Sequence, residues 1–134
     1  MRPRRRDERG VSSVELVLYM PILMLLILII IQFALVYLGN QAAGAIAREA
    51  ARTARVTCSE QEGEQAGYRY AAGISKGILD GVEVNVVRVA DGQMRATVKG
   101  AAQKLSPVGV PQVRQTVQGP VERFVGGANE SCPQ

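Results

Sequence analysis

The stretch that decides the fold is LVLYMPILMLLILIIIQFALVYL, residues 16–38. Only Pro21 and Gln32 interrupt its apolar run, apart from Tyr19 and Tyr37, whose rings suit the two membrane interfaces. As a helix the stretch would be about 34 Å long, against a hydrocarbon core of about 30 Å. A chain of 134 residues is too short to bury such a helix in a domain of its own. We therefore predict a transmembrane helix over residues 16–38.

The charges that flank this stretch predict its direction in the membrane. No Lys or Arg follows it until Arg48, whereas a basic leader precedes it. The arginines of the leader are Arg2, Arg4, Arg5, Arg6 and Arg9. Because positively charged flanks stay in the cytoplasm, we expect a single-pass protein of the plasma (inner) membrane, with its N-terminus inside and residues 40–134 outside.

A cleaved signal peptide is an alternative interpretation of the same stretch. The string Ala43-Gly44-Ala45 offers a cleavage site with small residues. The apolar run is, however, longer than the roughly 7–15 residues that are usual in a signal peptide. The length therefore favours an anchor that stays in the chain.

The composition argues against several classes of function. The formal charge is +4, but the excess lies mostly in the leader and does not predict a nucleic-acid-binding face. The chain has no histidine, and its two cysteines are too few for a zinc site. Neither a glycine-rich phosphate loop nor paired carboxylates stand out. We expect no enzyme activity, cofactor, metal, nucleic acid or small-molecule substrate.

The junction between leader and helix reads RGVSSVEL, residues 9–16, and places an acid at the edge of the membrane. A carboxylate inside hydrocarbon costs up to about 3 kcal/mol, so Glu15 needs a reason to be there. One reason is a capping box, in which Ser12 caps the helix and Glu15 bonds back to its first amide. An acid in the first turn also suits the helix dipole.

The combination of a basic leader, Gly10, Glu15 and an unbroken apolar helix resembles a type IV prepilin. The resemblance implies that a membrane aspartyl peptidase cuts after Gly10, which makes Val11 the new N-terminal residue. Val11 and Glu15 are then spaced i and i+4, on one face of the helix. In the family this acid is thought to pair with the free amine of an adjacent subunit, a role that can coexist with capping.

A closer resemblance is to TadE-like proteins, minor pseudopilins of the tight-adherence (Flp-type) pilus system. Besides the junction, the strings Met20-Pro21-Ile22-Leu23 and Gln32-Phe33 carry this likeness. The tail string Gly119-Pro120-Val121-Glu122-Arg123-Phe124 also resembles the ending of some members, so the likeness covers most of residues 9–55 plus this tail. It implies a pilin-like fold, a role in pilus assembly and adhesion, and three partners: a prepilin peptidase, other pilin and pseudopilin subunits, and the assembly machinery. The alternative is an envelope scaffold that is anchored in the membrane and never processed.

Pro21 removes one hydrogen bond of the membrane helix, so a kink or a loosened turn is expected there. A proline is also commonly tolerated in membrane helices without any special role. A flexible point that helps the helix fit a filament is the functional alternative. The sequence leaves both interpretations open.

The helix is expected to continue beyond the membrane to residue 57. Small residues recur there at spacings of three and four, as in a packing stripe: Ala43, Ile46, Ala47, Ala50 and Ala54. The stripe could pack on its own domain or on a neighbouring subunit. A second helix is expected over residues 60–79, with Ala66, Tyr70 and Ile74 on one side, and the acids Glu60, Glu62 and Glu64 on a solvated face.

Beyond residue 80 the pattern alternates, as in strands. Alternating apolar residues are Val82, Val84 and Val86, then Met94, Ala96 and Val98. Asp91-Gly92 predicts a hairpin turn, but a two-residue turn would mix the two faces. We therefore expect a bulge near Val86-Val87 or a longer loop. A third strand is expected over residues 112–118.

These elements predict an α+β fold: a long N-terminal transmembrane helix that extends into a small extracytoplasmic domain with a short helix and a three-stranded antiparallel sheet. The expected divisions are a leader at 1–10, the N-terminal helix at 11–57 and the outer domain at 58–134. Cys58 and Cys132 lie outside the membrane in this topology, where disulfides persist. A bond between them would stabilise the fold by about 4 kcal/mol; free thiols or pairing between chains are the alternatives.

Overall fold

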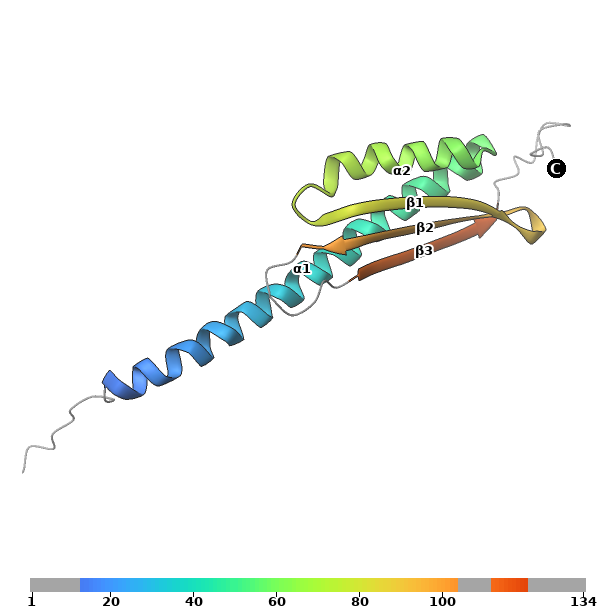
Figure 1. Cartoon of the computed structure of the whole chain (residues 1–134). Coiled ribbons are helices and arrows are strands. Elements are labelled where there is room, and N and C mark those ends of the chain that lie inside the picture. The colour runs from blue at the N-terminus through green and yellow to red at the C-terminus, as the bar shows by residue number, and fades with distance from the viewer. Residues whose placement is uncertain (1–12, 104–111, 121–134) are drawn as a thin grey trace, which may run out of the picture.

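The computed structural model describes residues 13–103 and 112–120 (Figure 1). One long helix runs through the structure; a second helix and a three-stranded antiparallel sheet lie against its C-terminal part, while its N-terminal part projects alone. The elements in chain order are α1 (Ser13–Thr57), α2 (Glu60–Ile74), β1 (Leu79–Val89), the 3-10 turn η1 (Ala90–Gly92), β2 (Gln93–Ala102) and β3 (Gln112–Pro120). This arrangement confirms the predicted α+β fold.

The helix α1 is 45 residues long, which corresponds to about 68 Å. It continues on both sides of Pro21, so this proline does not end the helix, and a local kink there stays a prediction. Near the C-terminal end, Arg55 donates a hydrogen bond from Nε to the carbonyl oxygen of Ala51 at 3.1 Å, where a cation also suits the helix dipole. The next residue after the helix, Cys58, has a φ of 56°, and this left-handed conformation turns the chain away from the helix axis.

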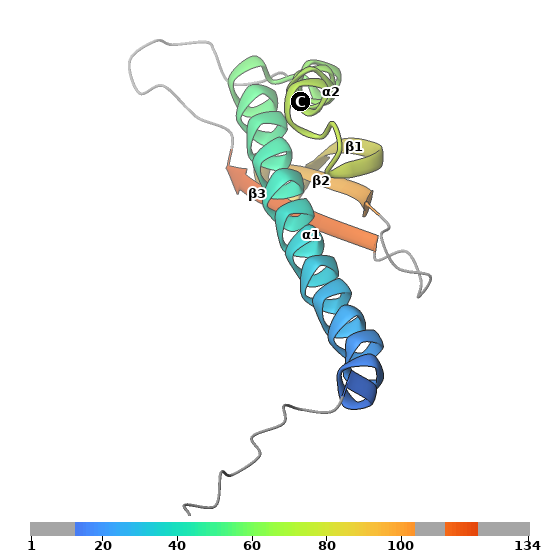
Figure 2. The ribbon, with the colours of Figure 1, turned by 90° about the vertical axis from the view of Figure 1, so that its left-hand side faces the viewer.

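The stripe of small residues on α1 is buried inside the head, by which we mean α2, the sheet and the part of α1 that they cover. Its members, Ala43, Ile46, Ala47, Ala50 and Ala54, are each 0% exposed. They pack against α2 and against the inner face of the sheet, which α1 crosses (Figure 2). The inner face is formed, with the predicted alternation, by Val84, Val86, Met94, Ala96, Val98 and Val113. The stripe therefore serves the core of its own chain.

The helix α2 ends at Ile74, so the prediction that it reaches residue 79 was wrong. Ser75 is the C-cap residue: its backbone N–H makes the last helical hydrogen bond, to the carbonyl oxygen of Ala71, and its hydroxyl donates to the same oxygen. Gly77 then adopts a φ of 75°, which favours glycine, and reverses the chain. Leu79, expected to be the last helical residue, instead begins β1 with its side chain in the core.

Two glycines set the distance between α1 and α2. The buried face of α2 consists of Gly63, Ala66, Gly67 and Ala71, while Tyr70, predicted to lie on this face, is 43% exposed. A Cβ atom added at Gly63 would lie 2.6 Å from the Cβ atom of Ala54, and one added at Gly67 would lie 2.7 Å from a methyl group of Val84. Because those gaps are smaller than any carbon contact, α2 can approach α1 and β1 this closely only with glycine at both positions.

The hairpin between β1 and β2 uses the longer loop. Val89 pairs with Gln93 across the three residues of η1, and this register places Val86 opposite Ala96, so that inner residues face inner residues. The register shift lies between Asp80 and Glu83 rather than near Val86-Val87, at a point where Gly81 has a φ of 60°. The strand order is β1-β2-β3, and β3 is two residues longer than predicted.

Three side chains of α2 bond to the outer edge of β1. The backbone N–H of Val84 donates to the hydroxyl of Tyr68 at 3.2 Å, and that of Val86 donates to Oε1 of Glu64 at 3.0 Å. The N–H of Arg88 donates in the same way to a carboxylate oxygen of α2, that of Glu60. The prediction that Glu60 and Glu64 only face solvent was therefore wrong.

The spacing of these bonds follows from the geometry of the two elements. The acceptors recur every four residues on α2, which is about 6 Å along a helix. The donors recur every two residues on β1, which is about 6.6 Å along a strand. The two repeats nearly match, so one helix face satisfies three successive edge amides. A strand edge that is covered in this way cannot pair with another strand.

The glycine contact predicts opposite effects for two alanine substitutions in the same helix. Gly63→Ala should lower the free energy of unfolding by about 1–3 kcal/mol, because its methyl group would meet Ala54 and the carbonyl oxygen of Ala50 at 2.9 Å. Gly73→Ala has no atom within 4 Å of the new Cβ and should raise stability by up to about 1 kcal/mol through helix propensity. Denaturant unfolding of both variants in detergent, followed by circular dichroism, measures the difference; equal effects would contradict the close contact.

The edge contact predicts a difference between two acids of α2. Glu64→Ala should cost about 1–2 kcal/mol, because the amide of the buried Val86 loses its acceptor. Glu64→Gln keeps an acceptor oxygen and should cost less. Glu62→Ala is the control, since the side chain of Glu62 is exposed, and a change within about 0.5 kcal/mol is expected. Similar losses for Glu62→Ala and Glu64→Ala in the same unfolding measurement would rule out the proposed role of the acceptor.

Candidate functional site

The candidate site is the apolar part of α1 that its own chain leaves uncovered. Every residue from 14 to 31 is exposed, and we call residues 14–31 the bare segment. Exposed fractions reach 77% at Val14 and 71% at Val17. The large apolar side chains of this segment are Val14, Leu16, Val17, Leu18, Tyr19, Met20, Ile22, Leu23, Met24, Leu25, Leu26, Ile27, Leu28, Ile29, Ile30 and Ile31.

The apolar side chains of the bare segment are expected to be buried by a membrane or by another protein. Water-soluble monomers rarely expose contiguous apolar patches beyond a few hundred Å². At the centre of a membrane, by contrast, each Leu, Ile, Val or Phe contributes about 0.3–0.6 kcal/mol in favour of insertion. The helix is long and apolar enough, by length and composition, to cross a bilayer. A single N-terminal apolar helix of this kind fits a membrane anchor.

The head begins to cover α1 on one side only, over residues 32–38. Gln32, Leu35 and Val36 are half-buried, and Val36 packs against the core of the head. On the same level, Phe33 and Tyr37 are 74% and 63% exposed. Above these residues the head surrounds α1 more fully: Gly39 is buried. The boundary between bare helix and head therefore lies inside the predicted transmembrane stretch.

Glu15 is located in the first turn of α1 and is exposed. From Ser13 to Ala47 it is the only charged residue in the sequence. No ion pair or hydrogen bond involves its carboxylate among the described residues. The acid therefore sits at the tip of an apolar rod, where a partner would have to come from outside the described part of the chain.

Several predicted site residues lie outside the described residues. These are the arginines of the leader, the junction residues Gly10 and Val11, the capping residue Ser12, and Cys132. Cys58 is described at the end of α1 and has a bonding partner in the structure. Its predicted partner is not among the described residues, so the pairing of the two cysteines stays a prediction.

Reasoning from the sequence missed the residues that close the head. Gly63 and Gly67 were expected at most to weaken α2, and the row Glu60, Glu64 and Tyr68 was not recognised as a set of edge acceptors. The i, i+4, i+8 spacing of oxygen-bearing side chains was the available signal. It has meaning only next to a strand edge, and the sequence did not say which strand would lie beside α2.

The part of the chain that contains the bare segment matches a known protein family. Residues 10–52 match the family described as TadE-like protein. The comparison with curated proteins found no match, and neither did the comparison with solved structures. The family match spans the leader junction, the bare segment and most of the buried stripe of α1, and it confirms the resemblance drawn from the sequence. Over residues 10–52 the chain is therefore similar to TadE-like proteins, which is consistent with a protein of the Tad pilus system.

Proposed function

We propose that this chain is a minor pseudopilin that takes part in the assembly of a Flp (tight-adherence) pilus and so in adhesion and surface attachment. One observation carries the proposal: a bare apolar segment projects from a closed head, in the part of the chain that is TadE-like. A helix of this kind can be stored in a membrane and then packed among similar helices in a filament. The mechanism is assembly rather than catalysis, and we assign no enzymatic role.

The proposed first step is removal of the leader by a prepilin peptidase. The peptide bond between Gly10 and Val11 is cut on the cytoplasmic side of the plasma (inner) membrane, and the head stays on the other side. The leader arginines favour this orientation. The match to the TadE-like family begins at residue 10, and α1 begins at Ser13, close behind the proposed cut.

The proposed second step is pairing of Glu15 with the new amine of Val11 in an adjacent subunit. A carboxylate that enters an apolar filament core without a partner would be costly. The amine of a neighbour offsets that charge and at the same time fixes the axial position of one subunit against the next. Between Val11 and Ala47 Glu15 is the only charged residue in the sequence, which favours it for this role.

The outer end of the molecule is proposed to be held by a disulfide between Cys58 and Cys132, within residues 58–134, the outer domain. Such a bond would tie the end of α1 to the C-terminal segment. Pro21 is proposed as a point where the bare segment adjusts its path when it moves from bilayer to filament. Both roles are compatible with a head that keeps its shape while α1 changes surroundings.

The cleavage step predicts that Gly10→Val leaves the protein unprocessed. The peptidase would meet a branched side chain where its substrates have glycine, and the retained leader would keep all of its arginines. A gel-mobility assay of membranes that also contain the peptidase should show only the longer form, against almost complete conversion of the unchanged chain. Gly73→Val, at an exposed position with no atom within 4 Å of an added Cβ, lies away from the junction and is the matched control. Normal conversion of Gly10→Val would contradict the proposed cleavage site.

The pairing step predicts that Glu15→Ala and Glu15→Gln are both processed but reduce incorporation into pili at least about tenfold. Glu15→Gln keeps an oxygen that can cap the helix and removes only the charge, so it separates pairing from capping. Glu49→Ala, an acid elsewhere on α1, is the control. Immunoblotting of sheared pili measures incorporation. Normal incorporation of Glu15→Gln would reduce Glu15 to a capping residue.

A further inference from the structure

The base of the head lies level with the upper end of the predicted transmembrane stretch. A Cβ atom added at Gly39 would lie 3.3 Å from the side chain of Leu79 and 3.4 Å from that of Val113. Leu79 begins β1 and Val113 is the second residue of β3, so the ends of both strands reach down to the turn of α1 that follows residue 38. The apolar stretch and the sheet therefore meet at the same height.

The length of the bare segment then determines how deeply the molecule is inserted in the bilayer. Residues 16–31 alone span about 24 Å as a helix, less than the hydrocarbon core of about 30 Å. The bilayer must therefore also cover the exposed side of residues 32–38, where Phe33 is 74% and Leu38 is 47% exposed. Tyr37 is suited to the interface at this depth. With the bilayer at this height, the base of the head is in the head-group layer.

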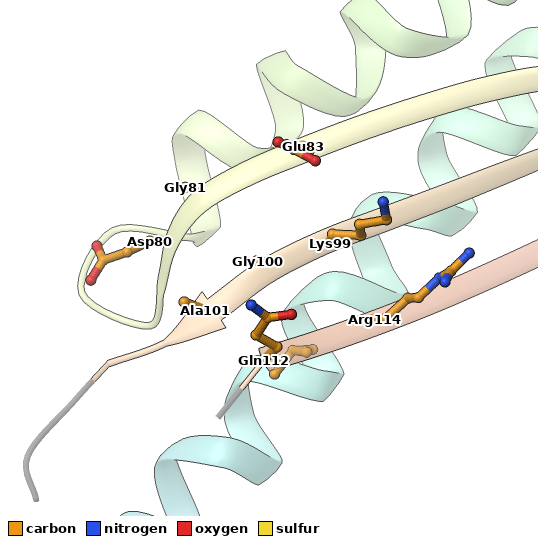
Figure 3. Close-up of a pocket in the computed structure, with 9 residues that line it drawn as sticks. Asp80, Gly81, Glu83, Lys99, Gly100, Ala101, Gln112 and Arg114 are labelled. Atoms are coloured by element: carbon orange, nitrogen blue, oxygen red, sulfur yellow. The ribbon is translucent and has the colours of Figure 1, made fainter. Parts of the chain in front are cut away.

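The outer face of the sheet has paired charges directly above that base. Lys99 of β2 and Arg114 of β3 are register partners, both exposed, with their side chains side by side on the face turned away from α1 (Figure 3). Arg114 lies two residues, or about 7 Å, from the first residue of β3, Gln112, and Lys99 lies three residues from the last residue of β2, Ala102. Neither cation takes part in an ion pair among the described residues. Lys99 also has Glu83 of β1 as its register partner on the other side, so the row across the sheet holds one carboxylate and two cations. An anion placed between Lys99 and Arg114 would offset the repulsion between these two like charges.

The same face has acids on the other side of a shallow hollow. The hollow has a volume of about 420 Å³ and is lined on the β1 side by Asp80 and Glu83, and on the β2 and β3 side by Lys99 and Arg114. Figure 3 shows the carboxylate of Asp80 pointing away from Lys99 and Arg114, so Glu83, the register partner of Lys99, is the acid that lies beside the two cations. Two cations with a carboxylate beside them match a head group that carries both a phosphate and an ammonium. We propose that the base of the head rests in the head-group layer of the membrane, and that this hollow binds a zwitterionic aminophospholipid, with its phosphate between Lys99 and Arg114.

The proposal rests on the membrane anchoring of α1 but not on cleavage at Gly10 or on pairing by Glu15. The bound lipid would set the angle between the head and the membrane before assembly. When the subunit leaves the bilayer for a filament, this contact is lost, and the hollow becomes free. Retention of the leader would therefore contradict the proposed function and leave the lipid contact intact.

The depth of the base can be measured with tryptophan, because the chain contains none. Gln112→Trp places a probe at the base, and Val87→Trp places one on the same outer face near the far end of the sheet. The full chain is reconstituted in nanodiscs of phosphatidylethanolamine and phosphatidylcholine, with a nitroxide on some head groups. Quenching of Gln112→Trp should be at least twice that of Val87→Trp. Lys76→Trp, in the exposed turn before β1, is a second base probe and should agree.

The proposed phosphate site between Lys99 and Arg114 is tested by native mass spectrometry of the full chain with added phosphatidylethanolamine. The double variant Lys99→Gln/Arg114→Gln should retain at least threefold less lipid than the unchanged chain. Arg52→Gln/Arg69→Gln removes the same charge from exposed positions away from the hollow and should retain lipid normally. Equal losses in both double variants would overturn the phosphate site. Equal quenching of base and far-end probes in inserted protein would overturn the contact of the base with the membrane.

Discussion

The structure depends on how the long helix α1 is covered along its length. Its upper part has an alanine-rich stripe that is fully buried by α2 and the sheet, whereas residues 14–31 have no cover from the described chain. The same helix therefore belongs to two environments. The hydrophobic effect holds the upper part inside a folded head, and it drives the lower part into a bilayer or among other helices.

The contacts that close the head allow few other residues at the positions that make them. Glycines at 63 and 67 let α2 lie directly on α1 and β1, and side chains of α2 cover the edge of β1. A core built largely from alanine buries little area for each residue, so it depends on this close approach. No residue of the bare segment belongs to the core that the described residues of the head form.

Local patterns in the sequence were enough to predict the helices and strands, but not the contacts between them. Each pattern lies within a single helix or strand and can be recognised without knowing its neighbours. This holds for the apolar run, for the stripe that ends at Ala54, and for the alternation around Val84 and Val98. The end of α2 was misjudged because Ser75 and Gly77 act through backbone geometry that outweighs a helical pattern. The role of Glu64 depends on a strand more than twenty residues away, which periodicity does not reveal. The proposed cleavage and pairing residues rest on the likeness to a family, and only Glu15 among them lies in the described part of the chain.

In the proposed function, α1 is released from its leader before it packs with the helices of other subunits. The most direct measurement is mass spectrometry of the N-terminal peptide of this protein, taken from sheared pili of cells that make it. The account predicts that the peptide begins at Val11, with or without a methyl group. A pilus-associated protein that still begins with the arginines of the leader would contradict it and would favour an unprocessed, anchored scaffold.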